Sequence, residues 1–393
     1  MAEKSIRQYV HQVGAIKRIP VSGTFELTPR CNLSCKMCYI HMTPAEQASR
    51  GRELTTEEWL AVGRQAVDAG MIYLLLTGGE PMLRPDFTTI YSEMVMMGVV
   101  VSVNTNGTLV TPEIVDCFRK HPPETVNVTL YGASPETYAG LCGVRGGYEK
   151  ALEGVRALIG AGVRVIINTT FTTRNLDDMD ALIAFVQEVG APIRTAAYTF
   201  PPVRNQHEDS RIALNAEEQG VLNARFEYLT STAQQRSSKE NYLRKALEAE
   251  EMRIKGPLPE CGNPSGCLAG RGLFWIAWNG EMYPCGMLSD YAVPMKRESV
   301  NFAAMWETTH KRTRTIYLPA ACTECALRRV CPSCAAVTHS NHGDSSRLVE
   351  DMCTYTKTYI STFLELMKTA EEASPAETDT AARGDDMEPF VCL

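Results

Sequence analysis

The sequence predicts an α/β fold built on a parallel sheet. Between residue 23 and about residue 200, short apolar runs with strand character alternate with segments whose apolar residues recur at helical spacing. Because strand–helix–strand units cross over with one hand, this alternation places successive strands parallel in one sheet. Six strands are fewer than a closed eight-stranded barrel needs, so periodicity alone leaves a doubly wound open sheet as an alternative.

The expected elements follow one another in order along this region. Strands are expected at residues 24–27, 72–77, 99–104, 125–130, 164–170 and 194–200. Helices are expected between them, near residues 55–69, 86–97, 112–120, 147–161 and 176–189. In such a fold the loops after the strands build the active site, so polar residues at those positions are the first candidates for function.

Composition excludes several classes of protein. The 393-residue chain has a formal net charge of −7 and no basic block, so nucleic acid is not an expected partner. The N-terminus lacks the apolar run of a signal peptide, and no stretch of about eighteen apolar residues predicts a membrane span. Fourteen cysteines without an export signal indicate metal ligation in a reducing cytoplasm rather than a disulfide framework.

The chain is expected to divide into five segments. Residues 1–22 would lead into an α/β domain at residues 23–211. Residues 212–256 are polar with helical spacing and are expected to bridge to a cysteine-rich domain at residues 257–370. The last segment, residues 371–393, is acidic and poor in apolar residues, which predicts disorder.

Three cysteines gather in the stretch Cys31-Asn-Leu-Ser-Cys35-Lys-Met-Cys38. Gaps of three and two residues place three thiolates on one short loop, where they can hold three irons of a [4Fe–4S] cluster and leave the fourth iron open. A zinc site would need a fourth Cys or His at close spacing, and only His41 is near. This stretch resembles the signature of the radical S-adenosylmethionine (SAM) enzymes.

The resemblance implies a fold and a chemistry. It implies a partial (β/α)6 TIM-like barrel with one open side, and a cluster whose open iron binds SAM. In that family the reduced cluster cleaves SAM, and the resulting 5′-deoxyadenosyl radical abstracts hydrogen from an unactivated C–H bond. The electron would come from a low-potential donor such as a flavodoxin or ferredoxin.

Further motifs resemble the family's SAM-binding positions. In the family the glycine-rich turn Gly78-Gly79-Glu80-Pro81 holds the methionine amino group of SAM. The other side chains expected around SAM are Asn106, Ser134 near the ribose, Arg145 on the carboxylate, and Asn168 and Tyr198 beside the adenosine. Four of them have a purely structural alternative. Asn106 would form an Asn–Gly turn and Ser134 would cap a helix. Asn168 and Tyr198 would be ordinary strand residues.

Eight further cysteines resemble the SPASM extension of radical SAM enzymes. That resemblance implies a first auxiliary [4Fe–4S] cluster on Cys261, Cys267, Cys285 and Cys334. It implies a second on Cys322, Cys325, Cys331 and Cys353, which makes three [4Fe–4S] clusters in the chain. The gap between Cys331 and Cys334 is one residue shorter than is usual in the family. Two zinc ribbons are the alternative that the same thiolates would satisfy.

Three cysteines remain outside these sets. Cys117 falls in a helical pattern and is expected to be a buried core residue, whereas Cys392 lies next to the C-terminus. Cys142 is expected in the loop before Arg145, near the cofactor. Because peptide epimerases of the superfamily use a thiol as hydrogen donor, Cys142 is a candidate catalytic residue.

Relatives with a SPASM extension modify ribosomally made peptides or install formylglycine in sulfatases. The resemblance therefore implies a maturase that converts a peptide precursor into a crosslinked, ring-closed or epimerised product. Sulfatase maturases carry an aspartate directly after the third auxiliary-region cysteine; here Gly286 follows Cys285, which weakens that alternative. Modification of a cofactor precursor and a non-catalytic iron–sulfur electron carrier stay open.

Substrate recognition is less defined by the sequence. Only about twenty residues precede the first expected strand, so recognition of a peptide leader would use a separate protein, another surface or no leader. Polar candidates for handling the substrate are Tyr198, Arg204, His207, Glu281 and Asp290. None of them is assigned as a general base.

Three filled clusters predict about twelve irons and about twelve acid-labile sulfides per chain in protein purified without oxygen. Metal analysis and a sulfide assay on the same sample measure both quantities. Zinc in place of iron and sulfide would contradict the assignment, because zinc ribbons contain no sulfide.

Overall fold

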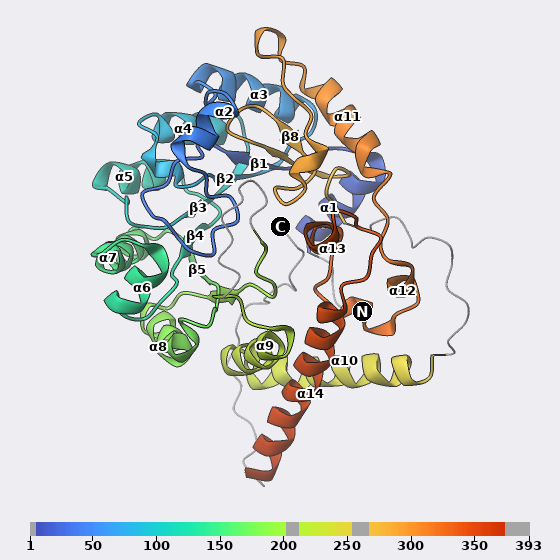
Figure 1. The fold of residues 1–393 in the computed structure, drawn as a ribbon. Coiled ribbons are helices and arrows are strands. Elements are labelled where there is room, and N and C mark those ends of the chain that lie inside the picture. Colours follow the sequence, from blue (N-terminus) through green and yellow to red (C-terminus); the bar gives the residue numbers. More distant parts are fainter. Residues whose placement is uncertain (1–4, 202–211, 254–266, 374–393) are drawn as a thin grey trace.

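The computed structural model describes residues 5–201, 212–253 and 267–373. In these residues one sheet has the strand order β6-β5-β4-β3-β2-β1-β7-β8. Its first six strands are parallel neighbours: β1 (Ser22–Glu26), β2 (Tyr73–Thr77), β3 (Val100–Thr105), β4 (Val126–Thr129), β5 (Val165–Thr169) and β6 (Ile193–Thr195). They curve with helices on the outer side (Figure 1). The predicted α/β fold with a partial barrel is confirmed.

Helices connect consecutive strands and cover the outer face of the sheet (Figure 1). They are α3 (Thr56–Asp68), α4 (Phe87–Met96), α5 (Pro112–Lys120), α6 (Pro135–Cys142), α7 (Gly147–Gly160) and α8 (Met179–Val189). Short helices add α2 (Pro44–Ser49), η1 (Pro81–Leu83) and η2 (Leu176–Asp178). Helix α6 was not predicted, because eight residues give too short a stretch for apolar periodicity to show.

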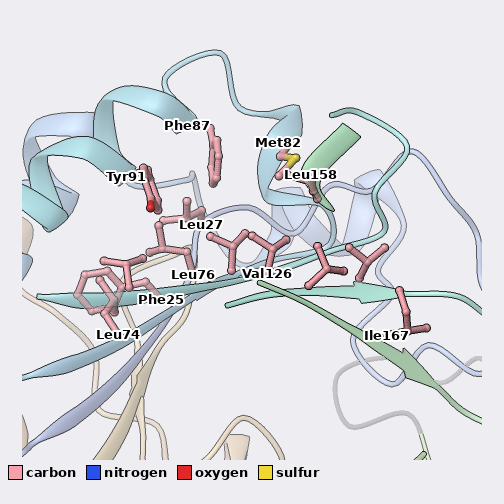
Figure 2. Packing of buried hydrophobic residues seen from close by; sticks show 14 of the residues in the cluster. Phe25, Leu27, Leu74, Leu76, Met82, Phe87, Tyr91, Val126, Leu158 and Ile167 are labelled. Carbon is pink, nitrogen blue, oxygen red and sulfur yellow. The ribbon is translucent and has the colours of Figure 1, made fainter. Parts of the chain in front are cut away.

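The main hydrophobic core lies on the helix side of the sheet. Along β3, Val101 and Val103 are buried against the helices, whereas Ser102 and Asn104 are half-buried on the opposite, concave face. Figure 2 shows side chains of the strands packed with those of α4 on the helix side: Phe25, Leu27, Leu74, Leu76, Phe87 and Tyr91. Parallel sheets are usually covered by apolar contacts on both faces. Here the concave face of β3 and β4 carries polar, half-buried side chains in place of an apolar layer.

The N-terminal segment forms helix α1 (Ile6–Lys17), which contacts the N-terminal ends of the strands. The guanidinium of Arg7 lies 4.5 Å from the ring centroid of Tyr73, and its Nη1 is 2.5 Å from the Glu124 carboxylate. The ring of His11 meets the same tyrosine edge-on, with centroids 5.4 Å apart. The segment expected only to lead into the barrel therefore packs against the end opposite to the predicted site.

Strand β6 is shorter than predicted. It ends at Thr195, although a strand was expected through residue 200. The next carbonyl, that of Ala196, accepts hydrogen bonds from the side chains of Gln219 and Asn223 at 3.5 and 3.4 Å. Both side-chain amides belong to the next long helix of the chain. They donate to a carbonyl that would otherwise bond to a neighbouring strand.

The segment expected to bridge the two parts folds into α9 (Ala216–Thr230) and α10 (Ala233–Glu251). Helix α9 packs along α14 (Glu350–Ala373) (Figure 1). Since α14 continues to Ala373, residues 371–373 are helical, although the predicted disordered tail began at residue 371. The rest of that tail lies outside the described residues.

Two strands of the cysteine-rich part belong to the barrel sheet. Strand β7 (Leu273–Ile276) pairs in parallel with β1, and β8 (Met282–Tyr283) pairs antiparallel with β7. Neither strand was predicted, and the boundary at residue 257 was expected to separate domains. The extension also contains α11 (Phe302–Thr313), α12 (Ala320–Thr323), α13 (Ala335–His342), η4 (Ser289–Tyr291), η5 (Arg297–Ser299) and η6 (Ala326–Arg329). Within the described residues, no helix is both long and apolar enough to cross a membrane.

Helix α7 approaches the turn after β3 so closely that only glycine fits between them. A Cβ at Gly154 would lie 2.1 Å from the carbonyl oxygen of Gly107. Gly154→Ala is therefore expected to destabilise the protein by about 1–3 kcal/mol, because the backbone must move. In the same helix a Cβ at Gly160 meets nothing within 4 Å. Gly160→Ala is expected to be neutral or to stabilise by up to about 1 kcal/mol.

Urea denaturation of the two variants beside the unsubstituted protein measures both effects. Equal effects of the two alanines would contradict this account of the helix–turn contact.

Candidate functional site

The three clustered cysteines and the glycine-rich turn line one cavity. It has a volume of about 50 Å³ and is lined by Pro29, Cys31, Leu33, Cys35, Cys38, Ile40, His41, Gly78 and Gly79. The cysteines come from residues 31–38, here called the cysteine loop, and the glycines follow β2. The structure thus brings together two motifs that lie about forty residues apart in the sequence. Glu80, from the same turn, does not line this cavity.

Close backbone packing joins the glycine turn to the segment before the cysteine loop. The amides of Gly79 and Glu80 donate to the carbonyls of Thr28 and Arg30, both at 2.8 Å. A Cβ at Gly79 would lie 2.4 Å from the Arg30 oxygen, so a side chain there would break this contact. Glycine is therefore required to hold the two loops together.

Glu80 is buried among hydrogen-bond donors at the end of β3. Its carboxylate is 0% exposed and accepts three hydrogen bonds: from the Met82 amide at 3.1 Å, the Thr105 hydroxyl at 2.8 Å and the Asn106 amide at 2.7 Å. Burial raises the pKa of Glu80 to about 7, against the opposing effect of these donors. Both oxygens lie inside the protein and are hydrogen-bonded, and a contact of this glycine turn with the amine of SAM stays a prediction. Glu80 fixes the glycine turn to the end of β3.

Asn106 extends this network to the cysteine loop. Its side-chain amide donates to Asn32 at 2.9 Å and lies 3.9 Å from the sulfur of Cys31. Its oxygen accepts hydrogen bonds from the amide and the hydroxyl of Thr108. The structure places Asn106 in a tight Asn–Gly turn whose side chain contacts the cysteine loop, and its contact with SAM stays a prediction.

Burial keeps the thiols of the cysteine loop protonated in the metal-free protein. It raises the pKa of Cys31 to about 12 and that of Cys38 to about 11, while the backbone amides of Leu33 and Ile40 partly offset the shifts. A cluster ligand must be a thiolate, so iron binding has to displace these protons. Proton release is therefore expected when the cluster is loaded.

The other residues predicted to contact SAM lie on different elements of the structure. Ser134 is the N-cap of α6 and accepts a hydrogen bond from the Thr137 amide at 3.1 Å, as its structural alternative required. Arg145 is exposed between α6 and α7 and does not line the cavity. Asn168 is half-buried on the concave face near the end of β5. Tyr198 lies beyond the end of β6, and its hydroxyl accepts a hydrogen bond from Asn341 of α13 at 2.7 Å.

Cys142 is not in a loop, contrary to expectation. It is the last residue of α6, is 0% exposed and belongs to the main hydrophobic core. Cys117, expected to be buried, is half-buried on α5. Neither residue lines the cavity described above.

The predicted second auxiliary set comes together in the extension. Cys322 lies in α12, Cys325 and Cys331 flank η6, and Cys353 is near the start of α14. Burial raises the pKa of Cys322 to about 11, and the nearby Cys331, Cys353 and Cys325 thiols add to the shift. The Cys322 thiol around α12, the two thiols that flank η6 and the Cys353 thiol of α14 are thus close enough to influence one another, and their joint ligation of a cluster stays a prediction.

Three cysteines of the predicted first auxiliary set lie among the described residues, and their assignment to one cluster stays a prediction. Burial raises the pKa of Cys267, and the neighbouring thiol of Cys334 adds to the shift. Cys285 and Cys334 pack against the same apolar group, which contains Leu288 and Ile316. Cys261 lies outside the described residues, as do Arg204, His207 and Cys392. Of the other polar candidates, Glu281 accepts from Asn279 and Tyr283, and Asp290 pairs with His339 at 3.0 Å.

The donor set of the cavity fits an iron–sulfur cluster with three protein ligands. Its lining contains three cysteines and, as a further nitrogen ligand, only His41. In the described part of the chain, no three His, Cys, Asp or Glu side chains are gathered as a single metal ion would require. A cubane offers its irons at separate corners and accepts thiolates that are further apart than those around one zinc.

The concave face carries a row of polar residues of which sequence analysis identified only Asn168. Asn127 of β4 donates from its side chain to Asn104 of β3 at 2.9 Å. Asn168 lies on the adjacent strand, next in register to Arg194, which is exposed. On the edge formed by the extension, Trp275 donates to the fully buried Glu26 at 2.9 Å. The signal that could have found this row is the polar residue at every second position of the expected strands.

Comparison with known proteins matches this geometry. The family model described as the Radical SAM superfamily matches residues 25–186. An AdoMet-dependent heme synthase of Methanosarcina barkeri is 29% identical over 339 residues, which are 84% of this chain and 95% of that protein. A PqqA peptide cyclase of Ruegeria pomeroyi is 28% identical over 172 residues, 44% of this chain and 45% of that protein.

A solved structure extends the likeness to nearly the whole fold. Streptococcus suis SuiB superposes with a TM-score of 0.62 at 18% identity, covering 88% of this chain and 81% of SuiB. The match includes the C-terminal extension as well as the barrel.

The raised pKa of Glu80 predicts a pH-dependent stability. Between pH 4.5, which is the ordinary pKa of this carboxyl group, and about pH 7, Glu80 of the folded protein keeps a proton that the unfolded chain has released. The unfolding free energy therefore falls as pH rises through this window, by on the order of 3 kcal/mol. Glu80→Gln cannot titrate, so its unfolding free energy should fall less.

Urea denaturation of the metal-free protein and variant at about pH 5 and about pH 8 measures the difference between their slopes. All other titrating groups are common to both proteins and cancel. Identical slopes would show that Glu80 titrates normally.

Proposed function

Because the chain is a radical SAM enzyme with a C-terminal extension, we propose that it is a maturase that modifies a ribosomally made peptide. The modification would be a crosslink, a ring or an epimerised residue, started by hydrogen abstraction. The observation that carries the proposal is the polar, accessible concave face beside the cysteine cavity. An extended peptide has unpaired main-chain amides, and this face offers partners for them.

The asparagine row is suited to main-chain recognition. The bond from Asn127 to Asn104 uses one side-chain hydrogen of Asn127 and the oxygen of Asn104. The Asn104 amide hydrogens and the Asn127 oxygen remain for a ligand, and Asn168 adds another amide on the next strand. Amide side chains can both donate to carbonyls and accept from N–H groups. A structure of SuiB bound to its precursor peptide, with a TM-score of 0.58 to this chain, supports the same class of substrate.

Each part of the cavity has a task in this proposal. Cys31, Cys35 and Cys38 would hold the [4Fe–4S] cluster, and the turn at Gly78 and Gly79 would lie beside SAM. The cluster and SAM together supply the 5′-deoxyadenosyl radical. The apolar side chains of Leu33 and Ile40 line the cavity and exclude water from it.

The extension would carry two auxiliary [4Fe–4S] clusters on the eight cysteines named above. The gathering of Cys322, Cys325, Cys331 and Cys353 supports one of them, and the Cys267–Cys334 pair supports the other. A flavodoxin or ferredoxin would supply electrons in the cytoplasm, and a separate protein would recognise a peptide leader.

A second candidate function is modification of a cofactor precursor. The heme synthase similarity favours it, because it spans 95% of the relative, whereas the peptide cyclase similarity spans 45%. The aligned region of the heme synthases therefore includes the extension. Arg194 on the concave face would suit a carboxylate of such a precursor, since guanidinium binds carboxylates in a bidentate way.

Cleavage of SAM tests the shared part of both candidates. With dithionite and without oxygen, the reconstituted protein is expected to form 5′-deoxyadenosine, and Cys35→Ala is expected to lower the rate by more than about 100-fold. Cys117→Ala, on α5, is the matched control and should retain activity. Three filled clusters without cleavage would instead indicate an electron carrier.

Mass spectrometry then separates the two candidates. Peptides encoded beside this protein are co-expressed with it, and loss of two hydrogens indicates a crosslink or ring. Deuterium uptake without other mass change indicates epimerisation. If the peptides stay unchanged and heme forms from added heme precursors, peptide modification is refuted and modification of a cofactor precursor is supported.

A further inference from the structure

The end of α6 holds Cys142 against the cysteine loop. The main-chain carbonyls of Leu141 and Cys142 accept hydrogen bonds from the amides of Lys36 and Ser34, at 3.0 and 2.9 Å. These two bonds lie on either side of Cys35 in the sequence. They bind the middle of the cysteine loop to the last turn of the helix, so Cys35 and Cys142 lie together.

The two thiols also interact through their side chains. Hydrogen bonding to Cys142, followed by burial, holds the pKa of Cys35 well above its ordinary value. Cys142 is 0% exposed, so no water competes for its S–H group. A hydrogen bond in such a site is electrostatically stronger than one in water.

Tyr138 lies on the core side of this pair of thiols, one helical turn before Cys142. It is 1% exposed, and its hydroxyl has no nitrogen or oxygen partner among the described residues. Burial and the nearby Cys142 thiol raise the pKa of Tyr138. A hydroxyl, a thiol and a cluster cysteine thus form a series that runs from the core to the cavity.

We propose that Cys142 is a positioning residue that donates its S–H to the sulfur of Cys35 when Cys35 ligates iron. Reduction adds one negative charge to the cluster, and a hydrogen bond to a ligating sulfur stabilises that charge. The bond therefore raises the reduction potential of the cluster that binds SAM. No covalent bond of Cys142 forms or breaks.

This role differs from the hydrogen donor expected from the sequence. A donor to a substrate radical must face the substrate, whereas Cys142 has no exposed surface and does not line the cavity. Cys142 would therefore act on the cluster only through its hydrogen bond to Cys35.

A redox titration followed by electron paramagnetic resonance tests the proposal in the anaerobically reconstituted holoenzyme. The relevant cluster is identified by the signal that changes when SAM is added. In Cys142→Ala, the ratio of reduced to oxidised cluster at a fixed potential should fall about three- to tenfold, where tenfold corresponds to 59 mV for one electron. Cys142→Ser keeps a donor and should stay within about twofold of the unsubstituted protein.

An unchanged ratio in the alanine variant, or an equal loss in both variants, would overturn the proposal. A purely structural role would lower the unfolding free energy of the alanine variant without moving the ratio. Should that variant fail to bind iron, Cys142→Val, which removes the donor but fills more of the space, takes its place: a fall of the ratio supports the proposal and no fall refutes it. Cys117→Ala controls for the loss of a thiol elsewhere.

Discussion

The geometry of the site depends on one buried carboxylate. Glu80 sits in the glycine turn after β2, yet its two oxygens hold the end of β3 through Thr105 and Asn106. Asn106 in turn contacts the cysteine loop at Asn32 and Cys31. A carboxylate without exposed surface is costly to bury unless donors surround it, and here three of them do. Loss of this group would therefore release the glycine turn, the strand end and the cysteine loop from one another at the same time.

A second constraint comes from the one-sided core. The outer face of the sheet is covered by helices and filled with aliphatic and aromatic side chains, and this packing supplies most of the hydrophobic stabilisation. The concave face contributes little to that core. Its polar side chains are those that the proposed function assigns to the substrate. Helix α1 packs at the opposite end of the strands from the cysteine loop.

The extension is part of the same sheet and not a separate appendage. Strand β7 adds to the free edge of β1, the strand that leads into the cysteine loop. Backbone hydrogen bonds thus connect the segment around the auxiliary cysteines directly to the barrel. Tyr198, bonded to Asn341, adds a side-chain link at the other edge of the sheet. A movement of the extension would therefore be transmitted through β7 to β1, the strand before the cysteine loop.

The sequence by itself determined the alternating strands and helices, the three cysteines of the loop and the glycine turn, because these depend on local spacing and periodicity. It also placed Asn106 and Ser134 in turns whose chemistry is local. Only the tertiary structure decided that Glu80 faces inward, that Cys142 lies against Cys35, and that β7 joins β1. Each of these is a contact between segments far apart in the chain, and a two- or four-residue strand has too few residues to show its pairing. The strand predicted through Tyr198 ends at Thr195 for the same reason, since the amides of Gln219 and Asn223, which bond the next carbonyl, come from a later helix.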